Sequence, residues 1–512
     1  MPVPLVGELA LWIALLLALW GVVVSTLGRA LHRPELVSSA ARALHALGSL
    51  LALALAALAT SLARLDLSLA YVAAHAGANA TRLELIGALW SGSAGALLLV
   101  GVVTATAASL AAASVARVAP PRDVATTVAT AHLALLGLVV TVVLGAPPFE
   151  GLPWLPADGR GLPPLQRHTA ALILPPIWAM AIAAAATTFA IATAAALGRI
   201  DRPVLAGLAM RWALRAWVLV TASLVAALWW SYETTGTPGI WTARVVGPVP
   251  LGAWIGLTGA VHLANAAGAA GPGRLRFAVL GLPLLLLLAS ALVRAEGTWD
   301  PLHELAHGRG AVWWVVMVAA LTQVFLYVLW RTPGIATPIH ARPGNTRALG
   351  SRLASAGGLL LLAGLAAGLV RRDHVVELRP GAATEVTGPL GRNWRVTFQG
   401  TSMREVRGPG GLPRWREMLV PLAMSEAGVE SHLVIAGVRE YLDALGRTTS
   451  PPWPQPAIRR GIARDMIVVP EELVDGEAVR MRISFVPLPG LIWIGGIALV
   501  VGAGLIAAGS RP

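Results

Sequence analysis

Residues 229–262, WWSYETTGTPGIWTARVVGPVPLGAWIGLTGAVH, leave one apolar segment, cross a short loop rich in Trp and Gly, and enter the next apolar segment. His262 then falls inside that second segment, roughly 12 Å from its inner end at the rise of an α-helix. An ionisable side chain at this depth in a membrane is costly and typically functional. Aromatic faces, small glycines and a buried imidazole together suit a protein that holds a flat apolar cofactor at a membrane surface.

The composition is that of a polytopic α-helical membrane protein. Of the 512 residues, 56% are hydrophobic and 13% are charged, whereas a soluble domain carries about 25% charged residues. The chain has no cysteine, which excludes disulfides, iron–sulfur clusters and thiolate metal sites. The net charge of +13 comes from arginines scattered through the loops. We therefore expect a lipid bilayer, and no nucleic acid, as a partner.

Runs of about 20 apolar residues predict membrane-spanning helices. We identify eleven, at residues 4–26, 38–62, 93–116, 125–146, 169–197, 208–230, 247–270, 276–293, 311–330, 350–370 and 488–508. The first lacks a basic leader and is too long for a signal-peptide core, so we interpret it as a retained span. Arginine is more frequent in the loops of one side, which predicts that this side is cytoplasmic. The predicted location is the inner (cytoplasmic) membrane, with a periplasmic N-terminus and a cytoplasmic C-terminus.

Residues 371–487 interrupt the helical pattern. Stretches such as 394–399 (WRVTFQ) and 479–485 (VRMRISF) alternate apolar and polar residues, and this period of two predicts strands. We predict a transmembrane core at 1–370, a small periplasmic β-rich domain at 371–487, and a final span with a cytoplasmic tail at 488–512.

Three histidines fall at similar depths inside predicted spans, namely His45, His132 and His262. Each has a structural interpretation, an imidazole bonded to a neighbouring helix. Neutral imidazole is also a frequent axial ligand of haem iron. The sequence alone leaves both interpretations open.

Residues 303–307 read His-Glu-Leu-Ala-His, which matches the HExxH pattern of zinc metalloproteases. Such a site needs the motif inside a helix and a third ligand. Here the motif lies in a short loop between two predicted spans. A membrane metalloprotease that uses His303, Glu304 and His307 remains an alternative.

Four tryptophans surround the loop that opens this section: Trp229, Trp230, Trp241 and Trp254. Tryptophan is enriched at membrane interfaces, so these side chains have a structural interpretation as anchors. The functional interpretation is a stacking platform for an aromatic ligand.

Several segments, taken in order along the chain, resemble the motifs of the CcmF-type cytochrome c haem lyases, within the CcmF/CcsA haem-handling membrane proteins. The matching segments are 66–75 (DLSLAYVAAH), 88–99 (ALWSGSAGALLL), 156–166 (PADGRGLPPLQ), 229–233 (WWSYE) and 457–469 (AIRRGIARDMIVV). The resemblance covers most of the chain and implies a divergent member of this family.

The resemblance implies a function in cytochrome c biogenesis. Such proteins take haem from a small haem chaperone, work with other cytochrome c maturation membrane proteins, and attach haem to the Cys-x-x-Cys-His motif of apocytochrome c. They also hold a b-type haem between intramembrane histidines. By position, His262 and His303 carry over as haem-iron ligands. The resemblance also implies that His307, Trp229, Trp230, Trp241 and Trp254 line a haem site.

The chain departs from the family pattern at three positions. Leu174 stands where the family has an outer histidine ligand, Ser355 where it has an inner one, and Arg244 where an Asp is expected. Neither Leu nor Ser ligates haem iron. We hypothesise that His168 compensates for Leu174, and that His45 or His132 compensates for Ser355.

Arg244 has a guanidinium that suits a haem propionate. The sequence favours haem binding and presentation on the periplasmic side, by a lyase-like protein whose enzymatic activity is left open by the lost ligands. The alternatives are a haem-free structural subunit of a membrane assembly and the metalloprotease.

Overall fold

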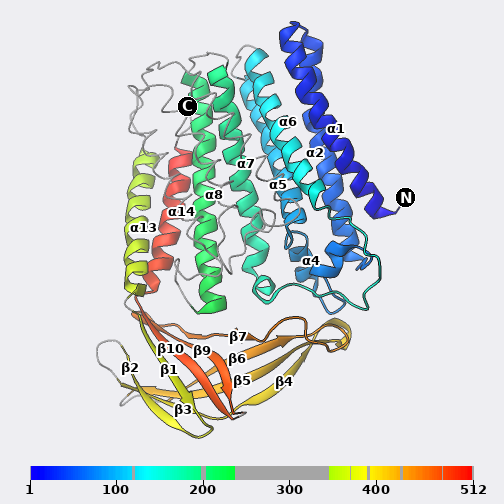
Figure 1. The fold of residues 1–512 in the computed structure, drawn as a ribbon. Helices are drawn as coiled ribbons and strands as arrows, with labels where there is room; N and C mark the ends of the chain where they lie inside the picture. Colours follow the sequence, from blue (N-terminus) through cyan, green and yellow to red (C-terminus); the bar gives the residue numbers. More distant parts are fainter. Residues whose placement is uncertain are drawn as a thin grey trace.

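In the computed structural model, the described residues are 2–117, 122–197, 203–236, 345–369, 371–388, 393–426, 431–475 and 477–509. Figure 1 shows long helices side by side, with a layer of β-strands across one end of the bundle. We call this the β-domain end. The functional residues discussed below lie there.

Eight helices in the described part are long and apolar enough to cross a membrane. They are α1 (Val3–Ala30), α2 (Pro34–Ala63), α5 (Ser93–Arg117), α6 (Arg122–Gly145), α7 (Ala170–Leu197), α8 (Pro203–Thr235), α13 (Asn345–Leu369) and α14 (Gly490–Ala508). They coincide with eight of the predicted spans. The other three, 247–270, 276–293 and 311–330, lie outside the described residues. The predicted fold class, a polytopic helical membrane protein with a β-rich domain, is confirmed.

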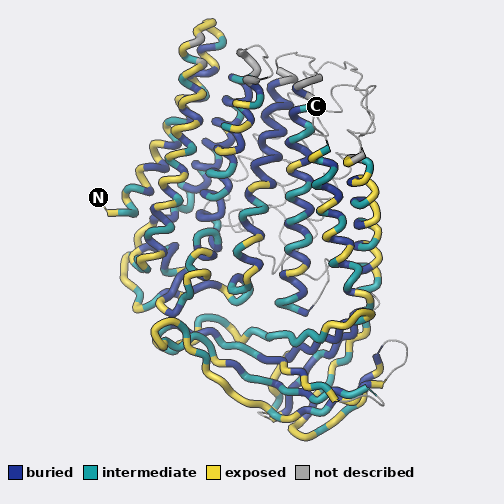
Figure 2. Tube along the Cα trace, turned by 180° about the vertical axis from the view of Figure 1, so that it is seen from behind, coloured by how far each residue is buried: buried dark blue, intermediate teal, exposed yellow. Residues whose placement is uncertain are grey.

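The position of each helix in the bundle follows from its sequence. In α1 the buried residues, such as Ala10, Leu11, Ala14 and Ala18, recur at three- and four-residue spacing, so one stripe packs inward. In α7 every residue from Ala181 to Ala194 is buried, because this helix packs against α5, α6 and α8. Figure 2 shows the same contrast between mixed outer helices and largely buried central ones.

Glycines bring α13 and α14 into close contact. A Cβ atom placed on Gly357 would lie 2.7 Å from the Gly495 carbonyl oxygen, and one on Gly502 would lie 2.7 Å from the Gly350 carbonyl oxygen. A Cβ atom cannot lie this close to a carbonyl oxygen, so only glycine fits at these positions. Small residues at helix interfaces let backbones approach in lipid, where no hydrophobic effect drives helices together.

Short elements cover the β-domain end of the first helices. They are α3 (Ala70–His75), α4 (Arg82–Ala88) and η1 (Pro164–Arg167). A capping box starts α4: the Thr81 hydroxyl accepts from the Glu84 N–H, and the Glu84 carboxylate accepts from the Thr81 N–H. The loop between α6 and α7 returns to these helices through an isolated β-bridge from Leu69 to Gly151.

The β domain consists of two antiparallel sheets. One has the order β1-β10-β9-β8; the other has the order β2-β3-β5-β6-β7, with β4 also paired to β5. The strands are β1 (Arg372–Leu378), β2 (Ala383–Thr387), β3 (Asn393–Phe398), β4 (Ser402–Arg407), β5 (Pro413–Glu426), β6 (His432–Tyr441), β7 (Trp453–Gln455), β8 (Ala457–Arg459), β9 (Arg464–Val474) and β10 (Ala478–Pro487).

The core of the β domain lies between the two sheets. Val396 and Phe398 of β3 are fully buried, as are Ile483 and Phe485 of β10. These are alternate residues of the two stretches whose period of two predicts strands. Both chain connections lie at one corner, because α13 leads into β1 and β10 leads into α14 (Figure 1).

Candidate functional site at the β-domain end of helices α7 and α8

Most residues predicted to hold a cofactor lie outside the described part of the chain. These are Trp241, Arg244, Trp254, His262, His303 and His307. The described part of the chain ends at Gly236, just after α8, and resumes at Asn345. It includes the point where the Trp-rich loop begins, and there it places Trp229, Trp230 and His168.

The two tryptophans near the end of α8 have different surroundings. Trp229 is 36% exposed, and its ring lies edge-on to the His168 ring, with the centroids 5.2 Å apart. Trp230 is fully buried, and its indole N–H donates to the Leu165 carbonyl at 3.0 Å. Trp230 therefore holds η1 against α8. Of the two tryptophans, Trp229 is the one whose ring is accessible to a ligand.

His168 lies between η1 and α7. Its Nδ1 accepts a hydrogen bond from the Ala170 N–H at 3.1 Å and so satisfies a free donor of the first turn of α7. A neutral imidazole whose Nδ1 accepts carries its proton on Nε2. Burial lowers the pKa of His168, while the Glu233 carboxylate acts in the opposite direction. The neutral ring with a donating Nε2 is the form that this arrangement favours.

This tautomer bears on the hypothesis that His168 replaces a haem ligand. A histidine that ligates through Nε2 normally donates a hydrogen bond from Nδ1. Here Nδ1 is an acceptor. Ligation through Nε2 would therefore require the ring to give up its bond to Ala170.

Leu174 fills the position of the family's outer histidine with an apolar contact. Its side chain is buried in a cluster with Ala170, Leu224 and Trp230, which joins α7 to α8. The two prolines that follow it lie inside α7. The described structure thus has helix packing where the family has a ligand.

The two histidines considered as replacements at Ser355 lie on other helices. His132, on α6, is fully buried with its Nε2 3.3 Å from the Thr187 hydroxyl of α7. His45, on α2, is exposed with its Nδ1 3.0 Å from the Ser109 hydroxyl of α5. Ser355 is exposed on α13, which packs mainly on α14. Compensation by either histidine stays a prediction.

Among the described residues, no group of three or more His, Cys, Asp or Glu side chains is placed to hold a metal ion. The His303–His307 motif, which carries the zinc alternative, lies outside those residues.

A buried ion cluster attaches the β domain to the helices beside His168. We call it the Glu84 cluster; its members are Glu84, Arg167, Arg414 and Tyr441. The Glu84 carboxylate lies 2.9 Å from the Arg414 guanidinium of β5 and 3.4 Å from that of Arg167. The Arg167 guanidinium also lies 4.3 Å from the centroid of the Tyr441 ring of β6. Arg167 directly precedes His168, so the cluster fixes the backbone of that histidine.

The carboxylate of Glu84 stays ionised despite its burial. Burial by itself raises the pKa of Glu84, but the bond from the Thr81 N–H and the Arg167 and Arg414 guanidiniums outweigh that effect and lower the pKa below its ordinary value. These three partners stabilise the charged form of the Glu84 carboxylate and offset the cost of burying it.

Two further side chains hold the β5 and β6 ends to the loops. The Asn79 amide donates to the carbonyls of Pro413 and Leu442, both at 2.7 Å. The Asp158 carboxylate, in the 156–166 motif, accepts from the Ala444 N–H at 2.7 Å. These bonds join segments more than 250 residues apart along the chain.

A second contact attaches the β domain to α8 and α14. We call it the Tyr232 cluster; its members are Tyr232, Ile467, Val469, Val486 and Trp493. The fully buried Tyr232 packs on the β9 and β10 side chains, and its ring centroid lies 5.5 Å from that of Trp493. Its hydroxyl donates to the Asp465 carboxylate of β9.

Both contacts surround the start of the Trp-rich loop. Glu233, which follows Tyr232, pairs with Arg460 of the β8–β9 turn. The β domain therefore holds the last two turns of α8, which include Trp229, and the η1 segment, which precedes His168.

Sequence reasoning did not single out Glu84 or Asn79. The pattern Thr81-x-x-Glu84 is the signal for a capping box and predicts the start of a helix. It contains nothing about the two arginines, which lie far away in the sequence.

No protein-family model matches the chain. The cytochrome c-type biogenesis protein CcmF of Pseudomonas fluorescens is 26% identical over 391 residues, which cover 73% of this chain and 57% of that protein. The CcmF of Pseudomonas aeruginosa is 29% identical over 262 residues, which cover 51% of this chain and 40% of that protein. A probable cytochrome c-type biogenesis protein of Escherichia coli, NrfE, is 29% identical over 198 residues, covering 38% and 36%. The chain thus spans at most 57% of the length of these relatives.

The structure is similar to a solved one titled cytochrome c haem lyase CcmF, with a TM-score of 0.70 and 20% sequence identity. The match covers 99% of this chain and 98% of that one. At this identity the likeness shows a shared fold, including the β domain between helices. Together with the sequence relatives, it identifies the chain as a divergent member of the CcmF-type cytochrome c biogenesis proteins.

Proposed function

We propose that this protein binds haem at the β-domain end of its helices and presents it for covalent attachment to the Cys-x-x-Cys-His motif of apocytochrome c. The observation that carries the proposal is the pair of His168 and the open ring of Trp229, held at the start of the Trp-rich loop by both β-domain contacts. The relatives, whose names specify cytochrome c biogenesis, support the same function.

The proposal includes an orientation and a division of the chain. Residues 1–370 form the haem-handling core, 371–487 a periplasmic domain, and 488–512 the last span with a cytoplasmic tail. The β domain and the N-terminus face the periplasm, and the C-terminus faces the cytoplasm. The excess of arginine in the loops of the opposite side supports this orientation.

Under the proposal His303, in the same motif as His307, would be an iron ligand of the haem at the β-domain end, and His262 would be a ligand of the haem held inside the membrane. Trp241 and Trp254 would line the haem with their aromatic rings, and Arg244 would pair with a propionate. The described residues fit the edge of such a group: Trp229 offers an aromatic face, and the Nε2–H of His168 offers a donor for a carboxylate. They do not offer a second iron ligand at Leu174, which is buried in helix packing.

The catalytic contribution of this chain is positioning. When bound, haem supplies the vinyl groups that accept the thiols of the apocytochrome. The chain has no cysteine, so its own side chains do not compete for those vinyl groups. Trp229 and His168 orient the group, and the Glu84 and Tyr232 clusters keep both residues in place. A small haem chaperone and other maturation proteins are the expected partners.

Absorption spectroscopy of the protein purified in detergent tests the proposal. We expect a Soret band that is weakened in His262→Ala and in His303→Ala and unchanged in His374→Ala. His374 is a matched control because its Nε2 bonds only within the β domain, to the Thr387 carbonyl at 2.8 Å. A protein without a Soret band that still supports cytochrome c formation would overturn the haem assignment.

The same spectra test the hypothesis of compensating ligands. An altered band in His45→Ala or His132→Ala would support a role for that residue at the inner haem, and unchanged bands in both would remove it. The metalloprotease alternative requires bound zinc and an activity lost in Glu304→Ala. The similarity to cytochrome c biogenesis proteins favours haem handling over this alternative and over a haem-free structural subunit.

A further inference from the structure

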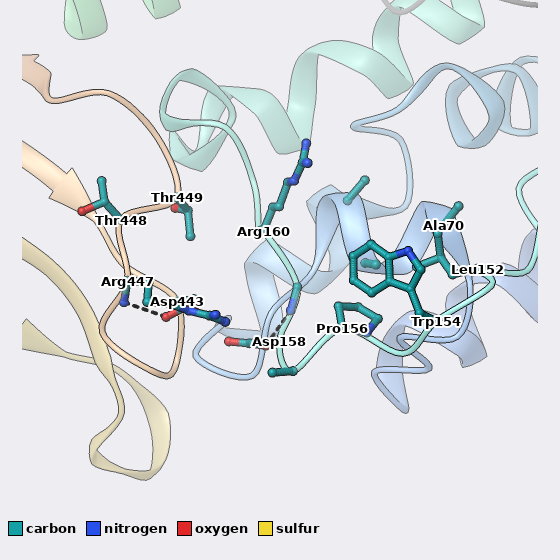
Figure 3. A pocket seen from close by; sticks show the side chains of 14 residues that line it. Ala70, Leu152, Trp154, Pro156, Asp158, Arg160, Asp443, Arg447, Thr448 and Thr449 are labelled. Atoms are coloured by element: carbon teal, nitrogen blue, oxygen red, sulfur yellow. Dashed lines mark hydrogen bonds and ion pairs between the residues drawn. The ribbon is translucent and has the colours of Figure 1, made fainter.

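A pocket of about 640 Å³ opens where the loop between α6 and α7 meets the turn between β6 and β7 (Figure 3). Small residues of α3, Ala70, Ala73 and Ala74, line it. One wall is formed by residues 152–160 and the other by residues 443–449. Its volume lies within the range of about 300–1,000 Å³ that is usual for binding pockets.

The two walls are held rigidly by their own carboxylates. The Asp158 side chain accepts from the N–H groups of Ala78 at 2.9 Å and Ala444 at 2.7 Å, so it ties the walls to each other. The Asp443 side chain accepts from the N–H groups of Leu445 at 2.9 Å and Arg447 at 2.8 Å. Both carboxylates are therefore engaged with backbone, and the pocket is formed before any ligand arrives.

The charge that remains available in the pocket is positive. Arg160 is exposed, and its guanidinium makes no hydrogen bond or ion pair to any described residue. The Arg447 side chain is 62% exposed and uses its Nε to pair with Asp443 at 2.8 Å. Its terminal nitrogens make no hydrogen bond or ion pair to any described residue. The two guanidiniums suit a carboxylate.

Large apolar side chains lie at the opposite side of the pocket. Trp154 lines the pocket and is 66% exposed; the next residue, Leu155, lies outside the lining and is 72% exposed. Figure 3 shows Trp154 at one side beside Leu152 and Pro156 and Asp443 with Arg447 at the other, while the Arg160 side chain extends upward from the loop that joins the two sides. Tryptophan and arginine are the side chains most enriched in the energetic centres of protein interfaces.

We propose that this pocket docks an extended acidic segment of a partner protein, which places an aromatic or aliphatic side chain against Trp154 and carboxylates against Arg160 and Arg447. The charge favours an acidic partner, because both acidic side chains of the walls are already engaged. The exposed Leu155 side chain beside the pocket favours a protein over a small molecule, because a ligand confined to the pocket would leave that side chain in water. The proposal is independent of haem binding.

The absence of cysteine from the chain permits a direct test in the full-length protein. The variant Leu155→Cys, carrying a nitroxide spin label and reconstituted in lipid nanodiscs, reports mobility and surroundings at one site. We use two peptides as probes, Gly-Phe-Asp-Glu-Gly and its amide counterpart Gly-Phe-Asn-Gln-Gly. We expect the acidic peptide to immobilise the label with saturable binding, and to bind roughly tenfold more tightly than the amide peptide, a ratio in the range of charge-assisted contacts.

Charge variants locate the binding. In the labelled protein, Arg160→Gln and Arg447→Gln should each weaken binding of the acidic peptide and leave binding of the amide peptide unchanged. Arg480→Gln is the matched control, because Arg480 is an exposed arginine on β10 that pairs with Glu377 and Glu472 away from the pocket. Equal binding of the two peptides, or binding unaffected by Arg160→Gln and Arg447→Gln, would overturn the proposal.

The label also distinguishes the pocket from a membrane anchor. Exposed Trp and Leu residues in an outer loop can insert into the headgroup region. If the label without peptide collides with a lipid-soluble relaxation agent and not with a water-soluble one, the apolar wall is a lipid contact and the docking proposal is wrong. We expect the reverse.

Discussion

The β domain meets the helical bundle at two places that are built on opposite principles. The Tyr232 cluster is an apolar contact around one tyrosine, whose hydroxyl reaches the Asp465 carboxylate. The Glu84 cluster is an ion network in which one carboxylate satisfies two arginines. Apolar burial is non-directional, whereas an ion network holds only in one geometry. The first contact therefore supplies adhesion near α8, and the second supplies orientation near His168.

Tyr232→Ala should have the largest effect on the attachment. Deleting a buried aromatic ring costs about 4 kcal/mol, and this one also leaves Asp465 without the tyrosine hydroxyl. We expect hydrogen–deuterium exchange in β9 to increase strongly, while exchange in β5 changes less. Tyr232→Phe keeps the ring and removes only the hydroxyl, so it separates the contribution of apolar burial from that of the hydrogen bond. This variant should lower the free energy of unfolding by only about 1 kcal/mol. Equal protection of β9 in both variants and the native protein would show that this contact does not hold the sheet.

Glu84→Gln should have the next largest effect, centred on the other contact. Breaking a buried ion pair by removing one partner costs about 3 kcal/mol, because the remaining charges lose their compensation. Exchange should increase in the peptide that covers η1 and the start of β5. The control is Glu472→Gln, whose carboxylate is 61% exposed and pairs with Arg480; exposed pairs contribute at most about 1 kcal/mol. Similar exchange in both variants would contradict an orienting role for the Glu84 cluster.

Asn79→Ala should weaken the same side by a smaller amount. Its amide donates to two carbonyls, and leaving buried carbonyls without a donor costs about 2 kcal/mol. Asn79→Asp has nearly the same shape but no amide donor, so it should destabilise the contact at least as much. The readout is exchange at Leu442 and Ala444. A stable Asn79→Asp protein would mean that shape, and not the two hydrogen bonds, matters there.

Acid should loosen the Glu84 side selectively and by the smallest amount. The pKa of Glu84 is lowered in the folded protein, so the unfolded state binds its proton more strongly. The free energy of unfolding therefore decreases as the pH falls below about 4.5, the ordinary pKa of this carboxyl. Glu84→Gln should lack this contribution. If hydrogen–deuterium exchange in η1 depended on pH in the same way in the native protein and in Glu84→Gln, the Glu84 carboxyl would not be the source of the acid sensitivity.

Much of the fold could be predicted because its determinants are local. Eight predicted spans match helices of the described structure, since a run of about 20 apolar residues specifies a spanning helix by length alone. The strands at 394–399 and 479–485 match β3 and β10, since a period of two shows in a single segment. The pairing of the strands into two sheets was not predicted, because register depends on partners far away in the chain.

The candidate site was predictable only in part. Trp229, Trp230 and His168 were singled out from composition and from motif resemblance. That Trp230 is buried and Trp229 open, and that His168 uses Nδ1 to cap α7, follows from the contacts of η1 with α8. The replacement of a family ligand by Leu174 was visible in the sequence, but its burial in the cluster with Trp230 was not.

The sequence by itself determined that this chain spans a membrane many times, carries a strand-rich insertion before its last helix, and resembles the CcmF-type cytochrome c biogenesis proteins. Hydropathy, periodicity and short motifs act within windows of a few to twenty residues, so one sequence records them. Only the tertiary structure decided how the β domain holds the bundle. Glu84, Arg167 and Arg414 come together from segments separated by up to 330 residues, and the low-dielectric contact that makes their charges strong exists only once the chain has folded.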